Sequence, residues 1–176
     1  MLILVTGGAA SGKSAHAERL LCARAVGARL YLATMAPQGA AAQRRIRRHR
    51  ALRAGKGFVT LERSCGLDGL HLPRRYDGIL LEDMGNLLAN ELYAPQAAGQ
   101  TALDSILAGI KRLQACCETL VIVTNEVFSD GLPYADETVC YIALLGRLNT
   151  ELAAQADAVY ESVCGLLLPV KEGKNR

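Results

Sequence analysis

Short apolar runs alternate along the chain with longer segments whose apolar positions recur at helical spacing. The runs that predict strands are Leu2–Val5, Arg29–Thr34, Phe58–Glu62, Gly78–Glu82 and Thr119–Thr124. The segments that predict helices are Ser14–Ala23, Ala40–Ala54, Asn86–Leu92, Thr101–Cys117 and Asp136–Ala156. Ala158–Lys171 is expected to form one or two terminal strands, broken at Gly165. Apolar strands that alternate with helices are typical of a mostly parallel sheet with helices on both faces, so the pattern predicts an α/β fold.

Composition narrows the class of protein further. Apolar residues make up 51% and charged residues 21% of the 176 residues, which predicts one globular domain over residues 1–176. The net charge of +3 and the absence of tryptophan argue against a surface that binds nucleic acid. The chain opens without a basic leader, has no apolar run long enough for a membrane span, and contains no C-x-x-C pair. We therefore expect a cytoplasmic protein with reduced cysteines.

A glycine-rich segment follows the first predicted strand and precedes a predicted helix. It fits the pattern G-x-x-x-x-G-K-[ST] with Gly7, Gly8, Ala9, Ala10, Ser11, Gly12, Lys13 and Ser14. In this pattern backbone N–H groups surround phosphate oxygens, Lys13 reaches the β- and γ-phosphates, and the Ser14 hydroxyl ligates Mg²⁺. The segment therefore predicts binding of a nucleoside triphosphate. His16, in the first turn after it, could lie near the phosphates, but we expect it at the surface and assign it no role.

Two carboxylates end a neighbouring buried strand, as a phosphate-binding loop requires. Glu82 and Asp83 directly follow the apolar run Ile79–Leu81. Either carboxylate could hold Mg²⁺ through water or position a hydroxyl nucleophile, and the sequence leaves the choice between them open.

The segment 43–53 carries six arginines and one histidine. On a helix Arg45, His49 and Arg53 share one face, because they are spaced at i, i+4 and i+8. Positive neighbours disfavour the imidazolium form, so the pKa of His49 is expected to fall. A neutral imidazole is a competent nucleophile toward phosphorus, and guanidinium groups stabilise the charge on a transferring phosphoryl group. His49 is therefore the candidate nucleophile.

Several motifs occur together in a fixed order: ILVTGGAASGKS, YLAT, RIRRHR, ILLED, VTNEV and LGRLNTELAAQADAVY. From Leu2 to Lys171 the chain resembles the bifunctional adenosylcobinamide kinase / adenosylcobinamide-phosphate guanylyltransferase family of cobalamin (vitamin B12) biosynthesis. The resemblance implies phosphorylation of adenosylcobinamide with ATP or GTP. A transfer of GMP from GTP would follow, giving adenosylcobinamide-GDP and pyrophosphate. It also implies a RecA-like P-loop NTPase fold and a homo-oligomer, namely a trimer.

The resemblance also implies roles for individual positions. His49 would carry GMP as a GMP–histidine intermediate, and Lys13 would be catalytic. Nucleotide-binding positions besides the loop would be Ala33, Thr34, Met35, Arg50, Ala51, Leu52, Arg53, Glu62 and Glu82. Apart from the resemblance, the loop pattern and the acidic strand end predict Ser14 and Glu82 as the metal ligands, with Asp83 still open as the alternative to Glu82. The segment Phe128–Pro133 departs from the glycine-rich G-x-G-I-V-P of many members, and we expect this to alter the surface that faces the corrinoid.

Two other functions remain open at this point. A small-molecule P-loop kinase that catalyses phosphorylation alone would use the arginine-rich helix only to clamp phosphates. A RecA-like NTPase that binds nucleic acid would use the same arginines on a polynucleotide.

Overall fold

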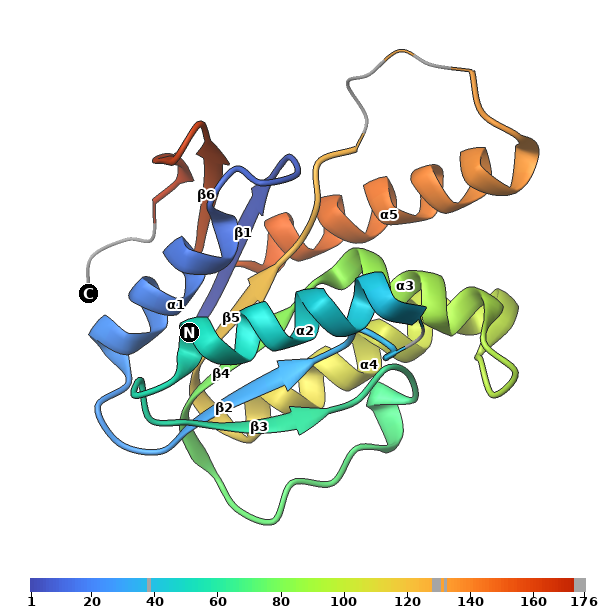
Figure 1. Cartoon of the computed structure of the whole chain (residues 1–176). Helices are drawn as coiled ribbons and strands as arrows, with labels where there is room; N and C mark the ends of the chain where they lie inside the picture. Colours follow the sequence, from blue (N-terminus) through green and yellow to red (C-terminus); the bar gives the residue numbers. More distant parts are fainter. Residues whose placement is uncertain (38, 128–130, 132, 173–176) are drawn as a thin grey trace.

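The computed structural model describes residues 1–37, 39–127, 131 and 133–172, and of these residues 41, 45 and 52 without their side chains. Its centre is a seven-stranded sheet with the order β3-β2-β4-β5-β1-β6-β7 (Figure 1). The strands are β1 (Leu2–Gly7), β2 (Arg29–Ala33), β3 (Phe58–Glu62), β4 (Tyr76–Glu82), β5 (Cys117–Val123), β6 (Ala158–Val163) and β7 (Leu166–Lys171). All neighbouring pairs from β3 to β6 are parallel, and β7 runs antiparallel to β6. The predicted mostly parallel sheet and the terminal strands, broken at Gly165, are confirmed, and the two terminal strands form a hairpin.

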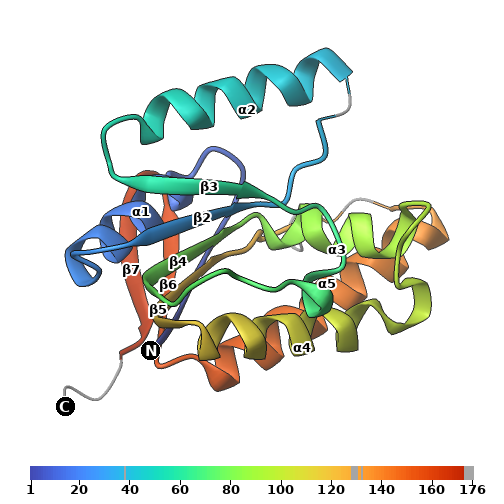
Figure 2. The same cartoon turned by 90° about the horizontal axis from the view of Figure 1, so that it is seen from below.

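Helices cover both faces of this sheet (Figure 2). They are α1 (Lys13–Arg24), α2 (Gly39–Arg53), α3 (Met84–Tyr93), α4 (Ala102–Ala115) and α5 (Asp136–Gln155), with short 3₁₀ turns η1 (Leu67–Gly69) and η2 (Gly99–Thr101). The helices α1 and α2 lie on one face, and α3, α4 and α5 lie on the other. The predicted bounds of the helices and of strands β1 to β5 agree with the structure to within two residues.

The alternation of side chains along each strand divides the core into two layers. Ile3 and Val5 of β1 pack with α1, whereas Leu2 and Leu4 pack on the side of α3, α4 and α5. Because both faces are covered, every position of such a strand is buried, which is why the central strands are continuous apolar runs. No helix within the described residues is long and apolar enough to cross a membrane.

The parallel strands place all their carboxyl ends at one edge of the sheet, where open α/β sheets bind ligands. Gly7 ends β1 there, and Glu82 ends β4. The two strands are not neighbours, since β5 lies between them. The prediction that the acidic strand adjoins the first strand is therefore wrong by one position. The helix α1 bridges the gap because it packs across β1, β5 and β4.

Candidate active site

The glycine-rich loop connects β1 to α1 in a conformation that needs its glycines. A Cβ atom at Gly7 would lie 2.5 Å from the Ser162 carbonyl oxygen and 2.7 Å from Ser11 Oγ. Gly12, which precedes α1, has a φ of 96°, in the left-handed region that favours glycine. The loop therefore turns back over the start of α1, where free N–H groups and the positive end of the helix dipole favour an anion.

Lys13 and Ser14 occupy the first turn of α1 and face the end of β4. Lys13 Nζ donates to the Gly8 carbonyl oxygen at 3.0 Å, so the side chain lies over the loop. Burial lowers the pKa of Lys13, and the negative charges of Asp83 and Glu82 oppose this shift. Ser14 Oγ donates to Glu82 Oε1 at 2.5 Å. The structure thus brings the predicted lysine, serine and glutamate together.

Glu82 has the donor chemistry of a magnesium ligand. It is 7% exposed, and burial, followed by the negative charges of Asp83 and Glu18, raises its pKa to about 7 against the effect of the Ser14 hydrogen bond. Its Oε2 atom is buried and has no hydrogen-bond partner among the described residues. A carboxylate oxygen without a partner beside a serine hydroxyl suits a hard divalent cation, so Ser14 and Glu82 fit the predicted Mg²⁺.

Asp83 has a different position and different partners. Its Oδ1 atom accepts hydrogen bonds from the backbone N–H of Asn86 at 3.1 Å and from Asn125 Nδ2 at 2.9 Å. The Asn86 side chain donates to the other carboxylate oxygen. Asp83 therefore caps the N-terminus of α3. Of the two carboxylates that the sequence left open, the structure favours Glu82 as the one that serves the phosphate-binding loop.

Three predicted nucleotide-binding residues form one row across neighbouring strands. Ala33 of β2 pairs in register with Glu62 of β3 on one side and with Glu82 of β4 on the other. Thr34 Oγ1 donates to the Glu82 and Asp83 carbonyl oxygens at 2.7 and 2.8 Å, which ties the end of β2 to the end of β4. Met35 follows as a half-buried residue. These predicted positions therefore lie together at the ligand-binding edge.

His49 lies on the sheet side of α2 and is half-buried. Its Nδ1 atom is 3.4 Å from the hydroxyl oxygen of Tyr31, and the Arg53 guanidinium lies 3.4 Å above the centroid of the Tyr31 ring. Burial, and then the charge of Arg53, lower the pKa of His49, while Glu18 and Asp83 oppose the shift. The predicted direction is confirmed, but its main cause is burial rather than like charge. The shift favours the neutral form of the ring at neutral pH.

Sequence analysis missed Tyr31, which the structure places at the centre of this arrangement. Tyr31 is 1% exposed on β2, and its ring packs edge-on against Phe58 with 6.0 Å between centroids. Burial and the negative charge of Glu82 raise the pKa of its hydroxyl. The available signal was a hydroxyl-bearing residue inside an otherwise apolar strand, since a buried tyrosine hydroxyl needs a polar partner.

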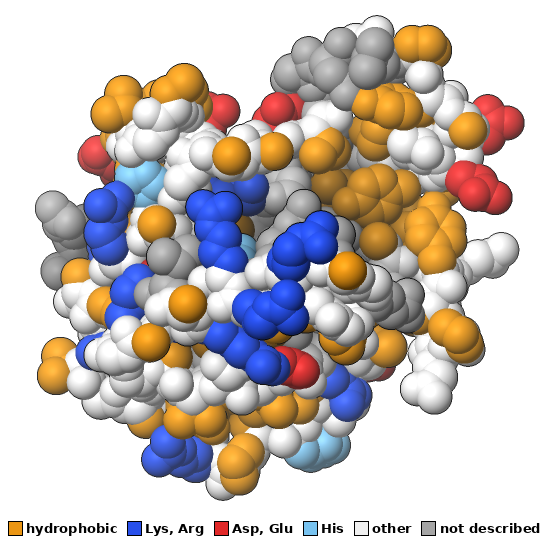
Figure 3. Space-filling model, in the orientation of Figure 1, with side chains coloured by type: hydrophobic (Ala, Val, Ile, Leu, Met, Phe, Trp, Pro, Cys, Tyr) orange, Lys and Arg blue, Asp and Glu red, His pale blue; other side chains and the backbone are white. Residues whose placement is uncertain are grey.

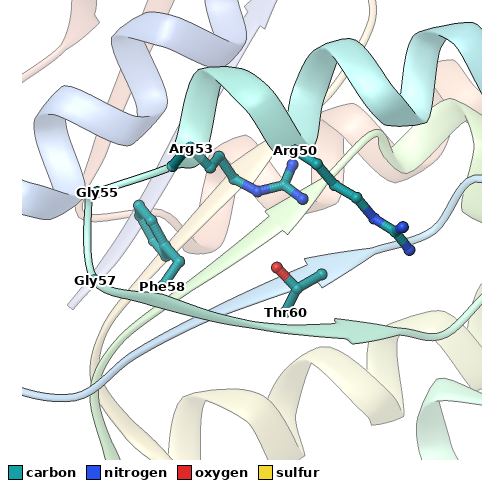
Figure 4. A pocket seen from close by; sticks show the side chains of 7 residues that line it. Arg50, Arg53, Gly55, Gly57, Phe58 and Thr60 are labelled. Atoms are coloured by element: carbon teal, nitrogen blue, oxygen red, sulfur yellow. The ribbon is translucent and has the colours of Figure 1, made fainter.

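A cavity of about 500 Å³ opens between the end of α2 and β3 (Figure 4). Its lining consists of Arg50, Arg53, Ala54, Gly55, Gly57, Phe58 and Thr60. Arg50 forms an ion pair with Glu62, so two further predicted nucleotide-binding residues meet beside the cavity. The volume of the cavity lies in the range of about 300 to 1,000 Å³ that small-ligand sites have.

Three other arginines of α2 lie on the molecular surface, where Figure 3 shows a group of Lys and Arg side chains. Arg44, Arg47 and Arg48 are exposed, and so is Ala51, which was predicted to bind nucleotide. The structure does not describe the side chains of Arg45 and Leu52. The predicted contact of Leu52 with the nucleotide, and the predicted helix face that Arg45 shares with His49 and Arg53, are therefore not tested.

The prediction that His16 lies at the surface is wrong. His16 is 6% exposed, and its Nε2 atom is 3.0 Å from the Gly165 carbonyl oxygen. Arg19 Nη2 is 2.6 Å from the other ring nitrogen. The turn between β6 and β7 folds over the loop and covers His16, a contact between residues far apart in the sequence that local spacing does not reveal.

The lowered pKa of His49 predicts an NMR titration. We expect the ring signals of His49 to titrate below pH 6.5, the ordinary value for histidine, because burial and Arg53 both disfavour the imidazolium form. A histidine peptide in the same buffer is the reference, and loss of the signals in His49→Gln assigns them. Titration of His49 at or above the value of the peptide would contradict the electrostatic account.

The fold and this site together define a P-loop nucleotide-binding protein, in which β1 leads into the phosphate-binding loop and β4 supplies the carboxylate. The sequence matches the model of the family "Cobinamide kinase / cobinamide phosphate guanyltransferase" (CobU) over residues 3–170, and the chain belongs to this family. It is 33% identical to the bifunctional adenosylcobalamin biosynthesis protein CobU of Escherichia coli (strain K12) and 36% identical to that of Salmonella typhimurium (strain LT2). Both alignments cover 97% of this chain and 100% of the relative.

A solved structure supports the fold. The chain is similar to the flagellar accessory protein FlaH of Methanocaldococcus jannaschii, with a TM-score of 0.52 and 16% identity. The superposition covers 98% of this chain and 78% of FlaH. At this identity the likeness concerns the α/β fold alone.

Membership of the family confirms the predicted function, a cobinamide kinase and cobinamide-phosphate guanylyltransferase of cobalamin biosynthesis with corrinoid and nucleotide substrates. Membership of the family argues against the two other functions that the sequence left open. These were a small-molecule kinase that catalyses phosphorylation alone and a RecA-like NTPase that binds nucleic acid. Of the segment that departs from the family pattern, Phe128, Ser129, Asp130 and Leu132 lie outside the described residues.

Proposed function

We propose that both reactions use the phosphate-binding loop and that His49 carries GMP between GTP and the corrinoid. The observation that carries the proposal is the position of His49. Its half-buried, neutral ring lies over the strand edge that holds Glu82 and is flanked by Arg53. A neutral imidazole beside fixed positive charge is suited to attack a phosphorus centre.

In the kinase step the hydroxyl of adenosylcobinamide attacks the γ-phosphorus of ATP or GTP, and the nucleoside diphosphate leaves. Lys13 and the N–H groups of the loop stabilise the charge on the transferring phosphoryl group. In the transfer step His49 attacks the α-phosphorus of GTP, and pyrophosphate leaves. The phosphate of adenosylcobinamide phosphate then attacks the bound GMP, which gives adenosylcobinamide-GDP and restores His49.

The test of this proposal uses GTP labelled at the α-phosphate and, separately, at the γ-phosphate. We expect the denatured wild-type protein to retain the α-label alone, in a bond that acid breaks and base does not, as for a phosphoramidate. Peptide mapping should place the label on His49. Retention of neither label by a protein that binds GTP would overturn the role of His49.

Mg²⁺ is a further part of the proposal. Ser14 and Glu82 would hold it, and it would neutralise phosphate charge. We expect Glu82→Gln to lower both activities about 10- to 100-fold and to raise the Mg²⁺ concentration needed for half-maximal rate, because the buried ligand loses its charge. Glu118→Gln, an exposed change on β5, is the matched control. An unchanged Mg²⁺ dependence in Glu82→Gln would contradict the assignment.

Four predictions complete the proposal. The nucleotide contacts of Ala33, Thr34 and Met35 are supported by their place at the carboxyl end of β2, and those of Arg50 and Arg53 by the cavity that both residues line. A single domain is supported by a sheet that takes strands from both ends of the chain. The homo-trimer and the cytoplasmic location rest on the family resemblance and on sequence composition, and they stay predictions.

A further inference from the structure

Tyr31 lies between the two chemically important side chains of this site, His49 and Glu82. Its hydroxyl oxygen lies 3.4 Å from His49 Nδ1. Register places it on the same sheet face as Glu82, because Ala33 pairs with Glu82 and Tyr31 pairs with Leu80 two residues earlier. The Tyr31 side chain therefore lies between the candidate GMP acceptor on α2 and the carboxylate at the phosphate-binding loop.

The surroundings of Tyr31 hold the ring in one place. The Arg53 guanidinium covers one side of the ring, and Phe58 packs against it edge-on at an interplanar angle of 84°. Only 1% of the surface of Tyr31 is exposed, so the residue makes few contacts with water. The direction of the hydroxyl group is consequently set by its polar neighbours, which are the His49 ring and the charge of Glu82.

A hydroxyl group has one proton and can also accept, so its contact with a neutral imidazole has two arrangements. If Tyr31 donates to His49 Nδ1, the ring proton is on Nε2, and Nε2 has no lone pair for attack. If Tyr31 accepts from Nδ1–H, the lone pair is on Nε2. Glu82, on the same face of the adjacent strand, has a buried carboxylate oxygen with no hydrogen-bond partner among the described residues. A hydroxyl group that donates its proton toward this oxygen keeps its lone pairs for Nδ1–H of His49, which favours the second arrangement.

We propose that Tyr31 is a positioning residue for guanylyl transfer: its hydroxyl oxygen accepts Nδ1–H of His49 and so makes Nε2 the nucleophilic nitrogen. This inference rests on the proposed role of His49 as GMP acceptor. In the step, the Nε2 lone pair forms the bond to the α-phosphorus of GTP, and the bond to pyrophosphate breaks with its electrons on the leaving oxygen. The Nδ1 proton stays on the ring, hydrogen-bonded to Tyr31. When the corrinoid phosphate takes the GMP, the P–N bond returns its electrons to Nε2.

The test is Tyr31→Phe, which removes the hydroxyl and keeps the ring that packs against Arg53 and Phe58. We expect the single-turnover rate of GMP attachment to fall about 10- to 100-fold, as for loss of a group that orients a histidine. The kinase rate with ATP should fall far less, because phosphorylation does not use the His49 ring. In ¹H–¹⁵N correlation spectra, His49 should be the Nδ1–H tautomer in the wild-type protein and lose that preference in Tyr31→Phe.

The matched control is Tyr76→Phe. Tyr76 is also a buried tyrosine with an arginine over its ring, 5.1 Å from Arg74, but it begins β4 at the opposite edge of the sheet. It should leave both the rate and the spectrum unchanged. An unchanged rate of GMP attachment in Tyr31→Phe, or an unchanged His49 tautomer, overturns the proposal. If the wild-type protein attaches no GMP, the proposed function fails, and the spectra still decide whether Tyr31 sets the tautomer.

Discussion

Replacement of His49 by alanine is expected to reduce formation of adenosylcobinamide-GDP by at least about 10³-fold, because loss of a covalent nucleophile removes the reaction path itself. The kinase step needs the phosphate-binding loop rather than the imidazole, so phosphorylation of adenosylcobinamide by ATP should be largely retained. Both steps are measured on one preparation with ATP labelled at the γ-phosphate and GTP labelled at the α-phosphate.

The kinase activity of His49→Ala serves as its own test of folding. His71→Ala is the matched control, since His71 is exposed and its ring contacts the carbonyl oxygen of Gly69. This control should resemble the wild-type protein in both steps. Formation of adenosylcobinamide-GDP by His49→Ala at a near wild-type rate would show that another group accepts GMP or that transfer is direct.

Replacement of Lys13 by alanine is expected to lower both activities by about 10²- to 10³-fold each, the range for loss of a group that stabilises transition-state charge. The reason is positional. Lys13 Nζ is held 3.0 Å from the Gly8 carbonyl oxygen, over the loop that receives phosphates in either reaction. Rates of γ-phosphate transfer and of GMP attachment are measured separately.

Lys111→Ala is the control for Lys13→Ala, because Lys111 is an exposed lysine on α4. It should leave both rates unchanged. Equal losses in the two steps support one shared triphosphate site. A loss confined to phosphorylation, with GMP attachment intact, would require a second site for GTP and contradict the shared loop.

Local chemistry explains why much of this site was predictable. The loop from Gly7 to Ser14 is a contiguous segment whose conformation depends on its own glycines, as the left-handed φ of Gly12 shows. His49 was selected because it is the one histidine in an arginine-rich helix, and the helix is present. The lowering of its pKa was predicted in direction, but burial against the sheet, its main cause, depends on how α2 packs.

Contacts between distant segments explain what was missed. Two sets of contacts decide which carboxylate serves the phosphate-binding loop. Helix α1 brings Ser14 to Glu82, whereas Asn86 and Asn125 donate hydrogen bonds to Asp83. The interposed β5 and the burial of His16 under the terminal hairpin are likewise matters of topology.

By itself, the sequence determined the order of strands and helices, the phosphate-binding loop, the candidate nucleophile and the family, because these depend on residue spacing and on contiguous motifs. Only the tertiary structure decided the order of strands in the sheet, the carboxylate that faces the loop, and the contact of Tyr31 with His49. The physical reason is that β2 and α2 place these side chains together through packing on the sheet, and spacing along the chain does not encode which strands become neighbours.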